Sequence, residues 1–363
     1  MSVKNRLIYS LINLAQRFIK KNPPLEERRF LIVSTTGLGD SIWATPAIKA
    51  LRQRFPTAHI SFLTSPLGEQ TLKNNPHINE IFVIRSSIFF SFLHLFFPLK
   101  KLKIDTIFLF HTSQRLVLPF CSLLGASILI GTKEINKGLD ALLTQALDKR
   151  PYHEIARRLE IVSQTGAYNP TPFLELYPSL EDEHIASESL KSKNIPSFIP
   201  LIGIHPGAKD KFKQWPPEAF IETGKLLKDH LGCQIILTGN SNEKELAEKI
   251  ASEIPGAFSL AGKLSVLQTA AVMKKLSVIV SNDTGPMHIA FAMRTPTVSI
   301  FVPTDANLCG PYFFQDAVIL QKLITCTPCL RKKCHDPFCM LQIGPKEVFE
   351  AALKLFYHQK IEI

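Results

Sequence analysis

The stretch SVIVSNDTGPMH, residues 277–288, joins an apolar run to a small polar turn and then to a helical segment. The apolar run predicts a buried parallel strand, and Met287 opens a predicted short helix. Backbone N–H groups at such a helix start are unpaired, and the helix dipole favours negative charge there. We therefore expect a diphosphate site at Thr284 and Gly285. The alternative is an ordinary turn in which Asp283 or Thr284 caps the helix.

The same alternation of strands and helices extends along the chain in both directions and is typical of parallel α/β sheets. Strands are expected at 30–34, 60–63, 81–84, 106–110, 127–130, 201–205, 234–238, 258–260, 277–281 and 297–301. A charged, proline-ended stretch at 181–199 interrupts the pattern. We therefore predict two Rossmann-like domains, 1–190 and 191–363, with the last helix, 345–357, as a candidate to pack back on the first.

The composition points to an anionic partner. The chain has 363 residues and a formal net charge of +11, which suits a nucleotide, a phosphorylated saccharide or an acidic lipid surface. Basic and aromatic residues do not alternate as in single-stranded nucleic-acid binders, so no nucleic-acid partner is expected. No segment reaches the roughly 20 apolar residues of a membrane-spanning helix. The seven cysteines do not resemble a secreted disulfide framework, and we expect a cytoplasmic protein without a signal peptide.

Two segments are candidates for contact with a membrane surface. Residues 4–21 predict a basic amphipathic helix, which either packs on its own domain or lies on an anionic bilayer. Residues 88–97 hold five phenylalanines and are followed by Lys100, Lys101 and Lys103. This second segment is too short to span a bilayer, so it is either a core helix or an exposed apolar patch with a basic rim.

The loop after the first strand is a second candidate site. Gly37 and Gly39 would allow a ligand to approach the backbone closely at the carboxyl end of the sheet, where such folds bind their ligands. Asp40 follows them directly. Its carboxylate either works as a base toward a ligand or caps the helix that we predict over residues 42–55.

Three loops at predicted strand ends together resemble glycosyltransferase family 9, the heptosyltransferases that build the inner core of bacterial lipopolysaccharide. The matching text is GLGDSIWATPAIKALRQRFP, GIHPGAKDKFKQWPPEAF and SNDTGPMHIAFAMRTPTVSIF followed by PTDANLCGPY, in the family's order. The resemblance implies a GT-B architecture, in which two Rossmann-like domains face a central cleft. It also implies an ADP-heptose donor in the C-terminal domain, a lipid-linked saccharide acceptor held mainly by the N-terminal domain, and no cofactor.

The resemblance assigns two catalytic residues. Asp40 matches the family's general base, which takes the proton of the acceptor hydroxyl as it attacks the anomeric carbon. Lys213 matches a lysine that reaches the diphosphate, where negative charge develops as the nucleotide leaves. Charge neutralisation by a lysine and a helix N-terminus removes the need for a divalent metal, so we expect transfer to be metal-independent.

Further donor contacts are expected around these loops. Asp283 is placed to bind sugar hydroxyls and His288 to face the phosphates, although each could be structural instead. Glu243 follows a strand end where a carboxylate could accept the ribose hydroxyls, with Glu245 as a competitor. The expected donor-binding residues are Gly37, Gly39, Glu243, Asp283, Thr284, Gly285 and His288.

A cysteine-rich segment near the C-terminus is a separate candidate. Cys326, Cys329, Cys334 and Cys339, with His335 among them, could hold zinc or an iron–sulfur cluster. The alternative is that they bind no metal, and they are not expected to take part in the transfer.

Three functions remain open at this point. The first is an inverting glycosyltransferase that uses ADP-heptose and a lipid A-linked acceptor, cytoplasmic or peripheral on the inner membrane. The second is a sugar nucleotide epimerase of the same GT-B shape. The third is a non-catalytic sugar nucleotide or lipid-binding protein. The presence of both Asp40 and Lys213 favours the first, because a binding protein needs no base.

Overall fold

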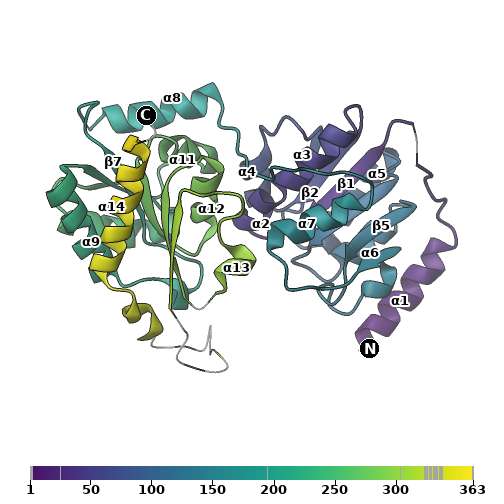
Figure 1. Ribbon diagram of the computed structural model, residues 1–363. Helices are drawn as coiled ribbons and strands as arrows, with labels where there is room; N and C mark the ends of the chain where they lie inside the picture. The colour runs from purple at the N-terminus through teal and green to yellow at the C-terminus, as the bar shows by residue number, and fades with distance from the viewer. Residues whose placement is uncertain are drawn as a thin grey trace. The chain divides into compact units, whose positions relative to one another are not determined.

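The computed structural model describes residues 3–24, 26–193, 195–302, 304–322, 326, 329, 334 and 338–361. The chain forms two compact units, Met1–Pro172 and Phe173–Ile363 (Figure 1). The division lies before the boundary expected at residue 190. The reason is that helix α8 (Leu180–Lys191) packs on α11 (Val266–Met273) of the second unit. An ion pair of 2.9 Å between Lys274 Nζ and Glu183 Oε1 adds to this contact.

The first unit is built on six parallel strands. In sheet order they are β3 (Glu80–Val83), β2 (His59–Thr64), β1 (Arg29–Ser34), β4 (Thr106–His111), β5 (Ile128–Thr132) and β6 (Gln145–Leu147). This is the strand order of a Rossmann fold, which confirms the predicted architecture of this half. Only the short edge strand β6 was not predicted. Successive strands are added on one side from β1 to β3 and on the other from β4 to β6, so the carboxyl ends of β1 and β4 mark the switch point where such folds bind ligands.

Two apolar layers cover this sheet. Phe30 and Ile32 of β1 point to one side and Leu31 and Val33 to the other, and all four are fully buried. The helices of the unit are α1 (Val3–Gln16), α2 (Leu38–Trp43), α3 (Thr45–Arg54), α4 (Pro66–Leu72), α5 (Ile88–Lys101), α6 (Val117–Ser122) and α7 (Glu154–Ser163). Residues of α3 and α7 pack on the first side, and residues of α1, α5 and α6 on the second.

The helix predicted over residues 42–55 is divided into α2 and α3. Pro46 explains the break, because it has no N–H and its ring would clash with the carbonyl of Ile42, four residues earlier. The hydroxyl of Thr45 donates to that carbonyl instead, at 2.8 Å. The turn at Ala44 ends α2 just beyond Asp40, so the segment that carries Asp40 is short and separate.

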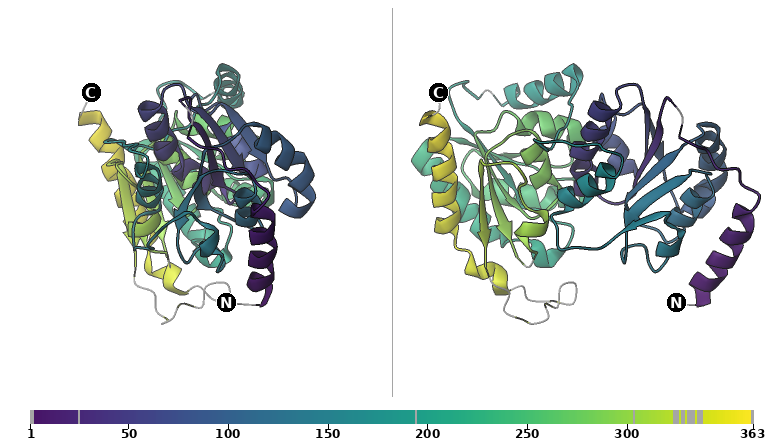
Figure 2. Two further views of the ribbon diagram at one scale, coloured as in Figure 1. Left: turned by 90° about the vertical axis from the view of Figure 1, so that its right-hand side faces the viewer. Right: turned by 45° about the vertical axis from the view of Figure 1, so that its right-hand side comes forward.

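The N-terminal helix α1 is shorter than the predicted 4–21 and packs on its own unit. Ile12 is buried in the core, and Asn5 Nδ2 donates to the carbonyl oxygens of Lys137 and Gly138 at 3.0 and 3.1 Å. Figure 2 shows α1 lying along the outside of the first unit. No helix of the described chain is long and apolar enough to span a membrane.

The second unit repeats the first in topology. Its sheet order is β12 (Ala317–Gln321), β11 (Thr297–Phe301), β10 (Val278–Asn282), β7 (Leu201–His205), β8 (Gln234–Leu237) and β9 (Phe258–Ser259), all parallel. The remaining helices are α9 (Pro217–Leu231), α10 (Lys244–Glu253), α12 (Gly285–Ala292), α13 (Ala306–Cys309) and α14 (Pro345–Ile361). The edge strand β12 was not predicted. Two Rossmann-like units are therefore confirmed.

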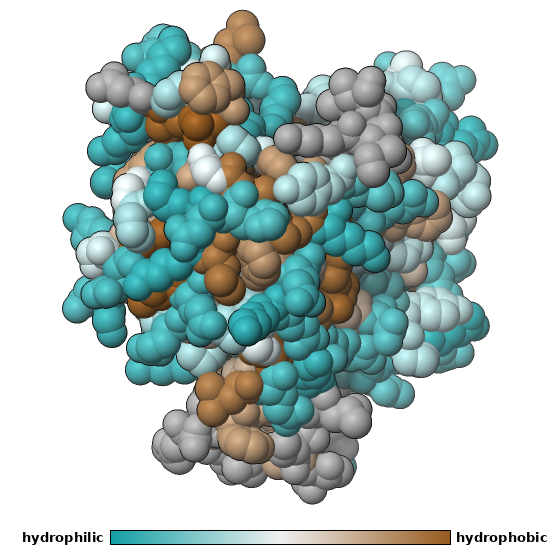
Figure 3. All heavy atoms as spheres, turned by 60° about the vertical axis from the view of Figure 1, so that its left-hand side comes forward, coloured by the Kyte–Doolittle hydropathy of each residue, from teal (hydrophilic) through white to brown (hydrophobic). Residues whose placement is uncertain are grey.

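The last helix packs within the second unit. Val348, Ala352 and Leu355 of α14 are buried in the core of the second unit, where the helix packs on α9 and on β10 to β12. The apolar side of α14 is therefore used within its own unit, and the expected packing on the first domain stays a prediction. The side of the second unit that carries α9 is mostly hydrophilic, with smaller apolar areas between the polar ones (Figure 3).

Candidate active site

The loop after β1 places Asp40 in a short helix rather than at its cap. Gly37 is the N-cap of α2, Gly39 lies in the helix, and Asp40 is in its first turn. The prediction that Asp40 caps the following helix is therefore wrong. Gly37 is exposed, and a Cβ atom built on it would meet no atom within 4 Å. The backbone at Gly37 is thus open to a ligand.

A buried arginine fixes the carboxylate of Asp40. Arg158 of α7 is fully buried, and its Nη2 donates to Asp40 Oδ1 at 2.7 Å. The same guanidinium donates through Nη1 to the carbonyl oxygen and to Oε2 of Glu154, at 2.8 and 2.7 Å. Its Cζ lies 5.3 Å from the ring centroid of Trp43. Since Arg158 is held on several sides, it holds Asp40 Oδ1 in one place.

Glu154 balances two buried arginines. Arg157 Nη2 donates to Glu154 Oε2 at 2.6 Å, and its Nη1 donates to the carbonyl of Phe110 at 2.8 Å. Burial opposes ionisation of Glu154, but the charges of Arg158 and Arg157 outweigh it and lower its pKa to about 2. The candidate site of the first unit is therefore a network of charged side chains from α2 and α7 next to the end of β4.

A histidine stands beside this network. His111 is the last residue of β4, next to the charges of Asp40 and Arg158. Burial lowers the pKa of His111 below its ordinary value, against the opposing charge of Asp40. A neutral imidazole next to a carboxylate is a second group that could accept a proton here.

Replacing Glu154 tests the network. We expect Glu154→Gln to lower the free energy of unfolding by about 2 kcal/mol. This is below the roughly 3–5 kcal/mol for a fully buried pair, because about a third of the Glu154 side chain is exposed. The pKa of this carboxyl is depressed in the folded state, so its contribution is present above its ordinary pKa of 4.5 and is lost as pH falls toward 2. Urea unfolding between pH 7 and pH 3 measures both effects.

The matched control for this prediction is Glu160→Gln on the same helix. Glu160 lies 3.9 Å from the exposed Arg150, and such a surface pair contributes about 0–1 kcal/mol. Two results would show that Glu154 does not balance the arginines. One is an equal loss of unfolding free energy in the two variants, and the other is a fall in the stability of Glu154→Gln with decreasing pH that matches that of the parent protein.

In the second unit, Asn282 organises the loops at the carboxyl ends of the strands. It is the last residue of β10, and its Nδ2 donates to the carbonyls of Pro206 and Gly207 at 2.8 and 3.3 Å. Its Oδ1 accepts from the backbone N–H of Trp215 at 3.1 Å. The indole of Trp215 is buried and donates to the carbonyl of Ile343 at 2.9 Å. The loop before Trp215 is thus anchored at its end.

Lys213 and Asp283 form an ion pair. Lys213 Nζ lies 2.6 Å from Asp283 Oδ2, and the hydroxyl of Thr304 donates to the same oxygen. The Asp283 side chain is 6% exposed and that of Lys213 is 21% exposed. The sequence predicted each residue at the site but not their contact. Without a ligand, Lys213 is therefore paired with a carboxylate of its own unit.

The turn into α12 leaves Thr284 and Gly285 partly accessible. Thr284 is the N-cap in an extended conformation, and its side chain makes no capping hydrogen bond to the helix, so the side-chain cap alternative is wrong for Thr284. Gly285 begins the helix and is half-buried. His288 is buried, with its ring 5.7 Å from that of Phe291. Thr284 and Gly285 are thus more accessible than His288.

Glu243, rather than Glu245, lies at the exits of β7 and β8. A Cβ atom on Gly207 would stand 2.1 Å from Glu243 Oε1, so a larger residue there would have to displace this carboxylate. Glu243 Oε2 accepts from the backbone N–H of Asn240 at 2.8 Å and lies 3.9 Å from His205 Nε2. Glu245 is exposed in the first turn of α10. These contacts fix Glu243 beside the loop that Asn282 holds.

The cysteine segment lies largely outside the described residues. Cys326, Cys329 and Cys334 are partly exposed, Cys339 is buried, and His335 is not described. Among the described residues, no group of three or more His, Cys, Asp or Glu side chains is arranged to hold a metal ion.

Several residues of these sites were not predicted from the sequence, among them Arg158, Glu154, His111 and Asn282. The spacing of Glu154 and Arg158 is that of an ordinary pair on a helix surface, so it carried no signal for burial. Asn282 stands next to Asp283 in the quoted motif, and its position at the strand end was the available signal.

The chain matches known proteins along most of its length. The family profile "Glycosyltransferase family 9 (heptosyltransferase)" matches residues 120–338. Lipooligosaccharide heptosyltransferase 2 of Campylobacter jejuni is 22% identical over 333 residues, which cover 88% of this chain and 96% of the relative. Lipopolysaccharide heptosyltransferase 2 of Escherichia coli K12 is 25% identical over 318 residues, which cover 82% of this chain and 88% of the relative.

Solved structures agree on the fold. A family 9 glycosyltransferase from Veillonella parvula aligns with a TM-score of 0.82 at 21% identity, over 93% of this chain and all of that one. ADP-heptose heptosyltransferase II of Escherichia coli aligns with a TM-score of 0.75 at 20% identity, over 92% and 99%. The architecture is therefore GT-B. Because the family profile covers more than half of its residues, the chain belongs to glycosyltransferase family 9, the heptosyltransferases.

Proposed function

We propose that this enzyme transfers heptose from ADP-heptose, with inversion, to a lipid A-linked acceptor of the lipopolysaccharide inner core. The observation that carries the proposal is a held carboxylate in one unit and a held lysine in the other. Asp40 is fixed by buried Arg158, and Lys213 is fixed by Asp283, each at the carboxyl ends of a Rossmann sheet. The names of the relatives support the choice of donor and acceptor.

In the proposed reaction Asp40 is the general base. The acceptor hydroxyl must lose its proton as it attacks an anomeric carbon with oxocarbenium character. Arg158 engages Oδ1 of Asp40, so we assign Oδ2 to the acceptor hydroxyl. Arg158 is then a positioning residue, because it acts on the substrate only through Asp40. Glu154 and Trp43 hold Arg158 in turn.

Lys213 and the start of α12 stabilise the leaving diphosphate. As the bond to the sugar breaks, negative charge grows on the phosphate oxygens, and a fixed cation stabilises that charge best. Thr284 and Gly285 add a hydroxyl and backbone donors at the helix N-terminus. Asp283 holds Lys213 through an ion pair, and we assign it the sugar hydroxyls of the donor.

Other residues shape the donor site. We assign the ribose hydroxyls to Glu243, which lies against Gly207 at the exit of β7. His288 is buried against Phe291 within α12, so we assign it an indirect role toward the phosphates, through the helix and not by direct contact. Gly37 leaves room for the donor at the backbone of the first unit, and we assign Gly39, in the first turn of α2, to the same contact.

We further propose that transfer needs no divalent metal, because Lys213 already supplies the positive charge. One solved structure in the comparison, a dodecameric glycosyltransferase TibC from Escherichia coli with a TM-score of 0.54, is described as iron-containing. The four cysteines are where such an ion would be sought in this chain, apart from the transfer chemistry. The proposed location is the cytoplasm, in peripheral contact with the inner membrane where the acceptor is anchored.

A donor panel tests the function. ADP-heptose should raise the melting temperature of the pure protein, since a ligand at a hundredfold its Kd stabilises by about 2.7 kcal/mol. UDP-sugars should not, and heptose should appear on a lipid A-linked acceptor only when ADP-heptose is present. Epimerases that use UDP-N-acetylglucosamine share the shape, with TM-scores of 0.50 and 0.52. If UDP-N-acetylglucosamine stabilises the protein and an epimerised product forms, the protein is an epimerase. If ADP-heptose stabilises it but no transfer occurs, it is a binding protein.

A further inference from the structure

Two helices of the first unit expose large apolar side chains to solvent. Each of the following residues is more than half exposed: Leu7, Leu11, Leu14 and Phe18 on or just after α1, and Phe89, Phe90, Leu93 and Phe97 on α5. We call these eight residues the apolar face. Clusters of this kind on a soluble domain mark interaction sites. In the second unit, Leu180 and Phe198 lie on separate segments, and the exposed Phe338 and Leu341 share only the short 3₁₀ helix Phe338–Gln342.

The apolar face is additional to the core contacts of both helices. On α5, Ile88, Leu95 and Leu99 point into the core, and the exposed side chains occupy the other side of the same helix. On α1, Ile12 is buried and the exposed leucines recur at helical spacing. Folding alone therefore does not explain the apolar residues on the outer sides.

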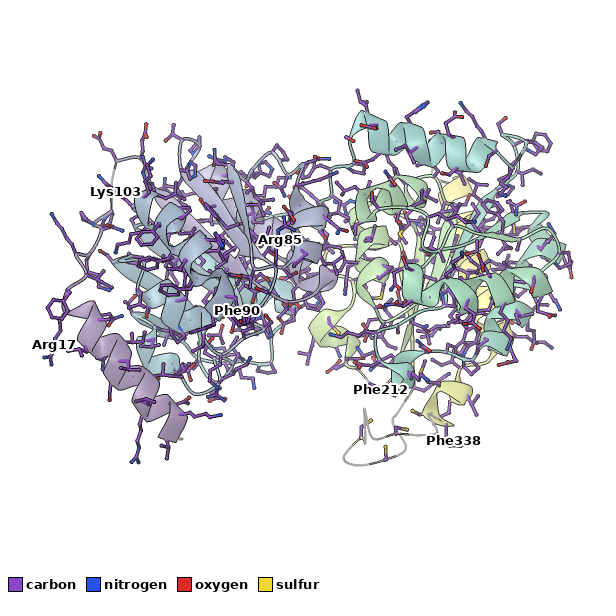
Figure 4. All side chains as sticks on the ribbon, turned by 180° about the vertical axis from the view of Figure 1, so that it is seen from behind. Arg17, Arg85, Phe90, Lys103, Phe212 and Phe338 are labelled. Carbon is purple, nitrogen blue, oxygen red and sulfur yellow. The ribbon has the colours of Figure 1, made fainter. Side chains whose placement is uncertain are left out.

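The two helices belong to one surface. Both pack against α6, which lies between them. The segment after α1 also meets the end of α5 at Gly125: a Cβ atom there would stand 2.9 Å from the carbonyl oxygen of Lys20 and 2.7 Å from Lys100 Nζ. Figure 4 labels Arg17, Phe90 and Lys103 on this side of the first unit. The exposed stripes thus approach each other where the lysines gather.

The two segments that carry the apolar face are basic. Residues 1–25 contain five Lys or Arg and residues 81–104 contain four, and neither segment contains Asp or Glu. The basic residues are Lys4, Arg6, Arg17, Lys20, Lys21, Arg85, Lys100, Lys101 and Lys103. Of these, Arg85 pairs with Glu69 at 3.2 Å. Burial and the charge of Lys21 lower the pKa of Lys100, which shows how closely the cations are placed.

We propose that this surface docks on an anionic lipid bilayer, with the apolar face inserted at the level of the acyl boundary and the basic residues at the headgroups. Apolar side chains rimmed by Lys and Arg are the pattern of interfacial helices. A second copy of the chain is a poorer occupant, because it would bring like charges together. The proposal rests on the proposed function in one respect, since a lipid-anchored acceptor gives the surface its use.

Vesicle binding by the full-length protein tests the proposal. We expect co-sedimentation with phosphatidylcholine vesicles that contain phosphatidylglycerol at low salt, weaker binding at high salt, and little binding to pure phosphatidylcholine. Lys101→Gln with Lys103→Gln should weaken the partition about thirtyfold. Phe90→Ser with Phe97→Ser should weaken it at least tenfold, by removing two inserted rings. These side chains are exposed, so the fold should remain.

Matched controls lie in the second unit. Phe198→Ser removes an aromatic ring that is 81% exposed, and Lys225→Gln removes an exposed lysine. Both should leave the partition unchanged. A Phe90→Trp variant should show a blue shift of its emission with anionic vesicles, after subtraction of the parent signal. Deleting α1 is a weaker test, because Ile12 and Asn5 hold the helix to the core.

Three outcomes would overturn the proposal: equal binding to neutral and anionic vesicles, an unchanged partition of the α5 variants, or no vesicle binding together with a dimer that Phe90→Ser dissociates. Failure of the proposed function is recognised separately. Donor binding and transfer to a water-soluble acceptor without vesicles should be the same for the parent and the surface variants. If neither occurs while anionic vesicles are still bound, the docking surface stands and the assigned reaction is wrong.

Discussion

Asp40→Asn should lower kcat for heptose transfer by about 10²–10⁴-fold, the contribution of a positioned general base. Asparagine has the same size and keeps an oxygen that can accept from Arg158 Nη2, which lies 2.7 Å from Asp40 Oδ1. The fold and donor affinity should therefore be nearly unchanged. Initial rates at saturating donor and acceptor, with donor affinity measured separately by calorimetry, give the result.

Two further variants show whether the loss belongs to Asp40. His111→Asn removes the neutral imidazole beside the carboxylate and should keep most of the turnover. Arg158→Lys should keep some turnover but change the pH profile of kcat, because the new ammonium group lies at a different position from Asp40 than the guanidinium does. If Arg158 had only a structural role, the substitution would lower activity equally at every pH. If Asp40→Asn has near-normal rates, or if only His111→Asn loses activity strongly, the general base is His111 and not Asp40.

Lys213→Met should reduce kcat/KM by about 10²–10³-fold, the usual effect of removing one group that stabilises charge in the transition state. Methionine keeps most of the length of the side chain and none of its charge. Donor affinity should fall as well, since the ground-state diphosphate is also negative. Asp283 loses its cation in this variant, so the melting temperature is recorded alongside the rates.

The same experiment examines a role for metal. Transfer by the parent protein should survive EDTA, and magnesium should not rescue Lys213→Met. The control Lys209→Met alters an exposed lysine in the same loop and should be nearly silent. If EDTA abolishes turnover and magnesium restores it, the cation is a metal and the assignment of Lys213 is wrong. Slow unfolding in EDTA would point instead to the cysteine segment.

The fold could be predicted because parallel strands buried on both faces read as continuous apolar runs. Phe30–Val33 and Val278–Val280 are such runs, and both strands were found within a residue of their predicted ends. The edge strand β6 was missed because it is short, half-buried and carries no comparable run, whereas β12 does contain an apolar run, Ala317–Leu320, that the prediction left out. The outer side of α5 could not be assigned, since apolar residues surround that helix on every side.

The candidate site could be predicted only where its residues stand in strand-end loops. Asp40, Lys213 and Asp283 were found in this way, and their roles stay predictions. Arg158 was not, because its partner Asp40 is 118 positions away and its helix reads as an ordinary amphipathic segment. The domain boundary was misplaced for a related reason: the charged pattern of α8 gives no sign that the helix packs on α11.

The resting pair of Lys213 and Asp283 bears on how the reaction cycle closes. A diphosphate that is held by a lone cation leaves slowly, because its departure would strand a desolvated charge. If Lys213 holds the diphosphate as proposed, then Asp283 Oδ2, which also accepts from the hydroxyl of Thr304, is placed to replace the departing nucleotide at Lys213. On this proposal the carboxylate of Asp283 competes with the product for Lys213, so the lysine that stabilises the leaving diphosphate is also the residue at which product release is promoted.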